Sequence, residues 1–323
     1  MSFTLTPQTS HLKPIKQMNR KAFLKTGLLA GGAVLTGLGD KVAAAARQAP
    51  VAQPFKTKFS PEFGIFADAA GNDVVDQIKW GFDNGFRAWE NTYLIRRPVA
   101  EQERISQAVQ KLGMEFGQFV GVFTFDAVSF AGRDKAIREK VLADMRASVE
   151  VAKRMNTKII HNVLGKADPN LPWDFQMANA IELLKRAAEI YEPHGMVMVM
   201  ESMNHKINHA GMFLHTIPQA YALAKGADSP SVKVLFDFYH VQIQEGNIIP
   251  TLDYAWDEIA YIQIGDTPGR NEPTSGEVNF KNILQHVYDK GYRGFVGMEH
   301  GTSKPGKEGE MITLNAYRQI DAK

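Results

Sequence analysis

The stretch Val234-Leu-Phe-Asp-Phe-Tyr-His240 decides the fold, because an apolar run there ends in an acid that is followed three residues later by a histidine. Three further segments have the same form: Val197-Met-Val-Met-Glu201, Ile259-Ala-Tyr-Ile-Gln263 and Phe295-Val-Gly-Met-Glu299. A short apolar run is typical of a strand that is buried on both faces. The sequence therefore predicts four strands, each with an oxygen-bearing side chain at its carboxyl end.

The spacing of these four side chains predicts that they converge. Successive intervals from Glu201 through Asp237 and Gln263 to Glu299 are 36, 26 and 36 residues. Each interval holds one helix, two loops and one strand, which is the length of a β/α unit. In a closed parallel barrel the carboxyl ends of all strands meet at one mouth, where active sites are built.

The four side chains also predict a metal site. A single glutamate at a strand end is more often an ion-pair partner, but several carboxylates at one mouth repel each other unless a cation or proton intervenes. Oxygen ligands are those that Mg²⁺ and Mn²⁺ prefer. We expect one divalent cation, Mg²⁺ or Mn²⁺, with Co²⁺ or Zn²⁺ as alternatives.

The remaining body continues the alternation of strands and helices. Further strands are expected at 63–67, 86–90, 114–120 and 158–161, with helical periods between them. With the four strands above, this makes eight. We predict a single-domain (β/α)₈ TIM barrel over residues 61–323. A doubly wound open sheet is the alternative, but no G-x-G-x-x-G motif follows the first expected strand.

Composition excludes several classes of function. The chain of 323 residues contains no cysteine, so disulfides and thiolate metal sites are excluded. Residues 1–47 hold seven basic residues and one acid, which leaves 30 basic and 34 acidic residues, or a net charge of −4, for the rest. An acidic body argues against nucleic-acid binding, which depends on electrostatic attraction to phosphates.

The N-terminal segment has the form of an export signal. Asn19-Arg-Lys-Ala-Phe-Leu-Lys25 is a basic flank, 26–38 is a short apolar and glycine-rich middle, and 43–46 is a run of alanines. It resembles a twin-arginine (Tat) signal with Lys21 in place of the second arginine. We predict a signal at 1–47, a linker at 48–60, and an exported, periplasmic protein without stable membrane insertion after processing. An N-terminal arm on a cytoplasmic protein is the alternative.

Other polar residues near the expected strand ends are candidates for substrate binding. His240 and Arg270 suit substrate oxygens, since imidazole and guanidinium groups donate hydrogen bonds there. The remaining candidates are Asn204 and His205, in the loop after Glu201, and Glu90 and His161, at the ends of two expected strands; for Glu90 and His161 local structural roles are the alternative. The aromatic residues at or after strand ends could wall a pocket or pack in the core: Phe66, Trp89, Phe123 and Trp173.

Three motifs resemble the hydroxypyruvate isomerase family within the xylose isomerase-like barrels. These are Met200-Glu-Ser-Met-Asn204, Phe236-Asp-Phe-Tyr-His-Val-Gln-Ile243 and Tyr261-Ile-Gln-Ile-Gly-Asp-Thr-Pro-Gly-Arg-Asn-Glu-Pro-Thr-Ser-Gly-Glu-Val-Asn-Phe280. The resemblance implies that Glu201, Asp237, Gln263 and Glu299 bind one divalent cation. It also implies that Glu201 and Glu299 act as the acid–base pair and that His240 contacts the substrate.

The expected function is that of a metal-dependent isomerase or epimerase. It would interconvert a hydroxy-carbonyl compound, hydroxypyruvate or a small sugar, through a metal-bound enediolate. An exported isomerase, epimerase or lyase acting on keto-sugars or keto-glycosides is the first alternative. A non-catalytic sugar-binding barrel and an apurinic endonuclease-like zinc enzyme are more distant ones. A homo-oligomer is left open.

Overall fold

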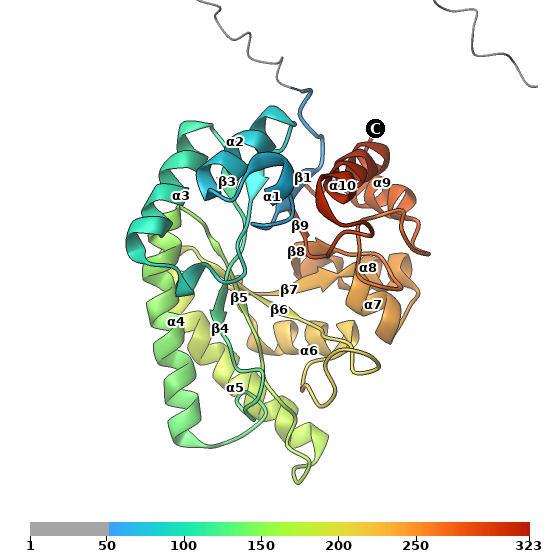
Figure 1. The fold of residues 1–323 in the computed structure, drawn as a ribbon. Coiled ribbons are helices and arrows are strands. Elements are labelled where there is room, and N and C mark those ends of the chain that lie inside the picture. The colour runs from blue at the N-terminus through green and yellow to red at the C-terminus, as the bar shows by residue number, and fades with distance from the viewer. Residues whose placement is uncertain (1–51) are drawn as a thin grey trace, which may run out of the picture. The chain divides into compact units, whose positions relative to one another are not determined.

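The apolar runs form parallel strands that are arranged around a closed barrel. The computed structural model describes residues 52–323, and the predicted signal at 1–47 lies outside that range and stays a prediction. Figure 1 shows the helices outside the curled sheet. The strands are β1 Lys58–Pro61, β2 Ala88–Trp89, β3 Glu115–Phe116, β4 Val120–Val122, β5 Ile159–Asn162, β6 Val197–Glu201, β7 Val232–Asp237, β8 Ile259–Ile264 and β9 Phe295–Met298.

Pairing among these strands closes the barrel. Seven strands form a parallel sheet in the order β1-β9-β8-β7-β6-β5-β4, and β2 pairs with β3. The amide of Glu90 donates to the carbonyl of Pro61, which connects β2 to β1. Because β3 and β4 are successive parts of one barrel position, the ring has eight positions, as predicted.

Helices follow the strands and cover the outside of the barrel. Side chains cap α2, α4, α6 and α9 at their N-termini by accepting backbone amides, as expected for Asp, Thr and Asn at this position. The helices are α1 Ala67–Ala70, α2 Val74–Asp83, α3 Val99–Lys111, α4 Lys135–Met155, α5 Trp173–Tyr191, α6 Ile217–Ala227, α7 Phe238–Gln244, α8 Ile248–Ala255, α9 Phe280–Asp289 and α10 Gly306–Ile320. Over residues 52–323, none of these is both long and apolar enough to span a bilayer.

The first strand differs from the prediction. We expected it at 63–67, but β1 lies at Lys58–Pro61, and its first three residues fall in the range expected as a linker. Gly64 has a positive φ of 99° and turns the chain, and Phe66 packs against the rings of Trp80 and Phe86 in the core. The apolar residues of 63–67 therefore belong to a partly buried loop, in which Phe66 is the buried side chain, and to the start of α1.

The segment after Asp237 is helical. It forms α7, which begins directly after β7, because Asp237 Oδ1 accepts the amide of Tyr239 at 2.8 Å and so caps the helix. His240 consequently lies in the first turn of a helix that is fixed to the strand end.

The close approach of α4 to the barrel depends on Gly121 in β4. A Cβ atom at this position would lie 2.7 Å from Ile160 Cγ2 and 2.9 Å from Ser148 Cβ. We expect Gly121→Ala to lower the free energy of unfolding by about 1–3 kcal/mol, the cost of overpacking a core. Gly301→Ala is the control, since its nearest neighbour would be 3.5 Å away. Equal destabilisation of both variants in urea unfolding would contradict this account.

Candidate functional site

The four predicted oxygen-bearing side chains lie together at the carboxyl ends of neighbouring strands. Glu201 ends β6, Asp237 ends β7, Gln263 lies one residue before the end of β8, and Glu299 follows β9. The parallel register places Asp237 beside Gln263 and Gln263 beside Gly297. Convergence, which the spacing predicted, is therefore observed.

A cavity of about 260 Å³ opens at this mouth. The second half of the barrel contributes five residues to the lining of this cavity: Glu201, His240, Gln263, Arg270 and Glu299. The first half of the barrel contributes Thr92, Tyr93, Val120, Phe125 and His161 to the lining, and the loop after β6 contributes Met203 and His209. The carboxylates and the guanidinium therefore come from the second half of the barrel, whereas the rest of the lining combines apolar side chains with neutral polar ones.

Several buried atoms of the cluster have no hydrogen-bond partner. Among the described residues, Glu201 Oε1, Gln263 Oε1, Glu299 Oε2 and His161 Nε2 are all buried and unpaired. A buried polar atom without a partner is costly, and such atoms are rare in folded proteins. Three oxygens in this state around one mouth are the donor set that a hard divalent cation would satisfy.

Arg270 bridges two carboxylates of the cluster. Its Nη2 atom lies 2.9 Å from Asp237 Oδ2 and 3.3 Å from Glu299 Oε1, and its Nε donates to the carbonyl of Glu299 at 3.1 Å. The guanidinium also lies over the ring of Tyr239, 4.7 Å from the centroid. Arg270 is thus placed at the cavity, as predicted, and is already ion-paired.

The loop that carries Arg270 is held by Asp266. The carboxylate of Asp266 accepts the amides of Thr267, Gly276 and Val278 at 2.9, 2.9 and 3.2 Å. Arg270 itself has a φ of 51°, in the left-handed region that only few non-glycine residues adopt. The fixed loop is what directs the guanidinium toward the carboxylates.

His240 has its tautomer fixed by Asn204. The backbone amide of Asn204 donates to His240 Nδ1 at 3.3 Å, and Asn204 Nδ2 lies 2.6 Å from the same nitrogen. Because Nδ1 accepts, a neutral ring carries its hydrogen on Nε2, which lies 3.3 Å from Glu201 Oε1 and 3.7 Å from Asp237 Oδ2. Glu201, Asp237 and His240 have ligand atoms close enough to share an ion. This tautomer, however, favours His240 as a hydrogen-bond donor.

Burial shifts the protonation of the cluster toward neutral forms. Burial, with the nearby charges of Glu299 and Asp237, raises the pKa of Glu201 well above its usual value. Burial also raises the pKa of Glu299 to about 7, although Arg270 opposes this effect. It lowers the pKa of His240 to about 3. A carboxyl group with a pKa near 7 can both take up and release a proton at neutral pH.

The remaining predicted residues lie near the cavity in different ways. His161 lines it and places Nε2 3.4 Å from Glu201 Oε2. Asn204 is buried and acts on His240. The ring of His205 stacks on His215 and lies against the carbonyl of Met212, away from the cavity lining. A contact between His205 and substrate stays a prediction.

Glu90 lies inside the barrel and does not line the cavity. It accepts hydrogen bonds from the hydroxyl of Tyr261 and from Gln118 Nε2. Gly297 provides the space for it, since a Cβ atom there would lie 2.6 Å from Glu90 Oε2. Burial raises the pKa of Glu90 to about 8. The role in substrate binding that we predicted for Glu90 stays a prediction.

Sequence reasoning missed part of the cavity wall. None of the four aromatic residues proposed for the wall lines the cavity; Phe66 and Trp89 are buried in the core. The phenyl and phenol rings at the cavity are Phe125 and Tyr93, and the neutral polar groups of that part of the lining include Thr92 and His209. The only signal in the sequence was the position of Thr92, two residues after the end of the expected second strand.

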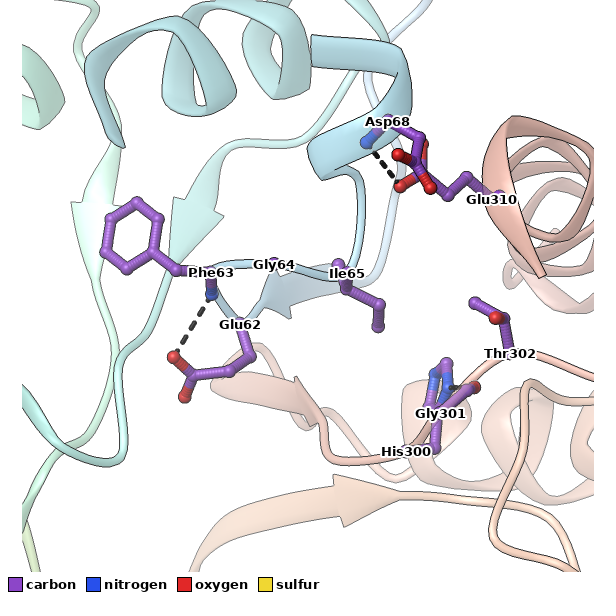
Figure 2. A pocket seen from close by; sticks show the side chains of 10 residues that line it. Glu62, Phe63, Gly64, Ile65, Asp68, His300, Gly301, Thr302 and Glu310 are labelled. Carbon is purple, nitrogen blue, oxygen red and sulfur yellow. Dashed lines mark hydrogen bonds between the residues drawn. The ribbon is translucent and has the colours of Figure 1, made fainter. Parts of the chain in front are cut away.

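A second cavity of about 330 Å³ lies between the loops that follow β1 and β9 (Figure 2). Its main polar groups are already paired. Glu310 accepts the amides of Asp68 and Ala69 at 2.8 and 2.7 Å, and Glu62 accepts those of Phe63 and Thr92 at 3.1 and 2.6 Å. We therefore assign the chemistry to the first cavity, and infer that Glu62 serves to hold the loop that carries Thr92.

The fold and the cluster of oxygen-bearing groups define a TIM barrel with a candidate metal site at its mouth. The family model of the xylose isomerase-like TIM barrel matches residues 78–319. The chain therefore belongs to that family, which confirms the predicted fold.

Curated relatives carry isomerase names. The chain is 28% identical over 245 residues to 2-oxo-tetronate isomerase of Pectobacterium atrosepticum, covering 74% of this chain and 92% of the relative. It is 29% identical over 169 residues to hydroxypyruvate isomerase of Escherichia coli, covering 52% and 64%. A structure of 3-keto-D-glucoside 4-epimerase from E. coli shares the fold with a TM-score of 0.67 at 17% identity, covering 82% and 99%. The prediction of an isomerase is confirmed at the level of the family.

The buried carboxyl group of Glu90 predicts a pH dependence of stability. Because its pKa is raised to about 8 in the folded protein, folding favours the protonated form. The contribution of this group to the free energy of unfolding is complete below its ordinary pKa of about 4.3, and it is lost as the pH rises toward 8. We expect the Glu90→Gln variant to lack this pH dependence. Between pH 5 and pH 8 its free energy of unfolding should therefore rise by up to a few kcal/mol relative to that of wild type.

Urea unfolding at both pH values measures this difference. The exposed Glu103→Gln on α3 is the control and should follow wild type. Parallel pH profiles for wild type and Glu90→Gln would refute the assignment.

Proposed function

We propose that the protein is a divalent-cation-dependent isomerase or epimerase of hydroxy-carbonyl compounds such as hydroxypyruvate or a small sugar. The observation that carries the proposal is the set of buried, unpaired oxygens of Glu201, Gln263 and Glu299 at one cavity. The isomerase names of the relatives support the reaction class.

The residues present fit a divalent cation. Glu201, Asp237, Gln263 and Glu299 would hold it through oxygen atoms, the ligands that Mg²⁺ and Mn²⁺ prefer. When bound, the cation supplies Lewis acidity to a carbonyl oxygen and orients two adjacent substrate oxygens. His240 is better suited to donate from Nε2 to a substrate oxygen, since Asn204 occupies its Nδ1.

Glu201 and Glu299 are the proposed acid–base pair. One carboxylate removes the proton from the carbon next to the carbonyl, and the C–H electron pair forms the carbon–carbon double bond of an enediolate. Return of the proton to the neighbouring carbon gives the isomer, whereas return to the opposite face of the same carbon gives the epimer. Two carboxyl groups on β6 and after β9, with β7 and β8 between them, support either outcome.

Two further side chains would stabilise the negative charge of the enediolate. The guanidinium of Arg270 and the Nε2–H of His240 both lie at the cavity. Donors that are held in place before the reaction stabilise developing charge without the cost of reorganisation. Asp237 supports both, because it pairs with Arg270 and caps the helix that carries His240.

Removal of either proton-transfer group should abolish most turnover. We expect Glu201→Gln and Glu299→Gln each to lower kcat by about 10²-fold or more, the scale of a positioned acid or base. The measurement is carbon–deuterium exchange by NMR, with the metal-loaded protein in D₂O and hydroxypyruvate and a panel of keto and aldo sugars. The exposed Glu308→Gln on α10 should retain wild-type rates. Near-normal exchange in either Glu201→Gln or Glu299→Gln would contradict the assignment of these residues as the acid–base pair.

Metal removal gives an independent prediction. We expect chelation with EDTA to abolish exchange and addition of Mn²⁺ or Mg²⁺ to restore it. Because Glu201 and Glu299 have raised pKa values, the cation must displace protons from them, and its binding should weaken as the pH falls below about 7. Calorimetric titration of Mn²⁺ at pH 6 and pH 8 in two buffers measures affinity and proton release. Affinity that is equal at both pH values would contradict the ligand assignment.

A further inference from the structure

The part of the cavity lining that lies outside the carboxylate cluster has a chemistry of its own. Val120, Phe125 and Met203 are apolar, whereas Thr92 and His209 offer neutral hydrogen-bonding groups. Arg270 is the sole Lys or Arg side chain among the described residues that line the cavity, and Asp237 and Glu299 already pair with it. This part of the lining therefore suits a neutral group better than an anionic one.

His209 is held at the wall by its loop. Asn204 Oδ1 accepts the amides of Ile207 and Asn208 at 3.0 and 3.2 Å, and the amide of His209 donates to the carbonyl of Asn204 at 3.0 Å. The ring packs edge-on against His240, with centroids 5.2 Å apart. The same residue, Asn204, thus positions both imidazoles.

The ring of His209 makes no hydrogen bond among residues 52–323, although it lines the cavity. Phe125 packs on it with centroids 6.2 Å apart. His215 of the same loop differs, because its Nδ1 lies 3.1 Å from the carbonyl of Phe213 and it does not line the cavity. A neutral imidazole has one donor and one acceptor, and both are available at His209.

We propose that His209 is a substrate-binding residue that, with Thr92, hydrogen-bonds the hydroxyl groups of a neutral polyol chain. The part of the substrate away from the carboxylates is then a hydroxylated carbon chain without a carboxylate. The inference rests on the proposed function in so far as it uses the same cavity, and it selects sugars over hydroxypyruvate as the substrate class.

Binding of a non-reacting polyol tests this assignment. The probes are xylitol, which is neutral, and glycerate, which is anionic, each titrated calorimetrically into the Mn²⁺-loaded full-length protein. We expect wild type to bind xylitol more tightly than glycerate. His209→Ala should weaken xylitol binding about 3- to 10-fold, the scale of one or two hydrogen bonds, with Mn²⁺ affinity unchanged. His209→Gln, which keeps a donor and an acceptor, should recover part of the loss.

The matched control is His215→Ala, which alters a half-buried histidine of the same loop outside the cavity. It should bind xylitol as wild type does. Wild-type xylitol affinity in His209→Ala, or preference of wild type for glycerate, overturns the inference. If xylitol binding depends on His209 but no compound of the panel exchanges deuterium, the inference stands and the proposed isomerase activity fails.

Discussion

Electrostatic repulsion among the carboxylates of Glu201 and Asp237, which are buried, and Glu299, which is partly buried, is the constraint on which the site depends. Three such groups at one mouth cannot all ionise without compensation, and burial strengthens their interaction. Arg270 supplies part of the compensation through Asp237 and Glu299. The loop after β8 is organised for that purpose, since Asp266 binds three of its amides and holds Arg270 in a left-handed backbone conformation. The unpaired oxygens that remain are those available to a cation.

The carboxylate cluster is also connected to the loop after β6, because His240 contacts both Glu201 and Asn204. Asp237 caps the helix that begins with the following residue, which brings the ring of His240 over Glu201. Asn204 then determines which nitrogen carries the hydrogen, and its side-chain oxygen binds the turn that ends at His209. One asparagine therefore couples the orientation of the His240 imidazole to the placement of the His209 imidazole, which packs edge-on against it.

The sequence predicted the second half of the barrel better than the first. Strands with buried faces and an oxygen-bearing last residue are recognisable locally, so Asp237 and Gln263 could be placed from their runs alone. The first strand could not, because Lys58-Phe-Ser-Pro61 is less apolar than the following Phe63-Gly-Ile-Phe-Ala67, whose burial arises from packing in a loop. Long-range contacts leave no local pattern either: the pairing of Arg270 with Asp237 and the enclosure of Glu90 by Tyr261 connect residues distant in sequence.

The two halves of the cavity also differ in how tightly their residues are constrained. A change at Glu201 or Asp237 alters a coupled set of buried charges, where an unpaired group costs several times a typical hydrogen bond. A change at Tyr93, which is exposed at the rim and stacks on Phe123, alters contacts worth little to the fold. In the proposed mechanism the barrel can therefore keep its proton-transfer groups unchanged while the loops after β2, β4 and β6 set which carbon chain lies against them. This separation would explain why the proposed catalytic residues can be predicted from strand ends, whereas the proposed substrate-binding residue His209 lies in a loop.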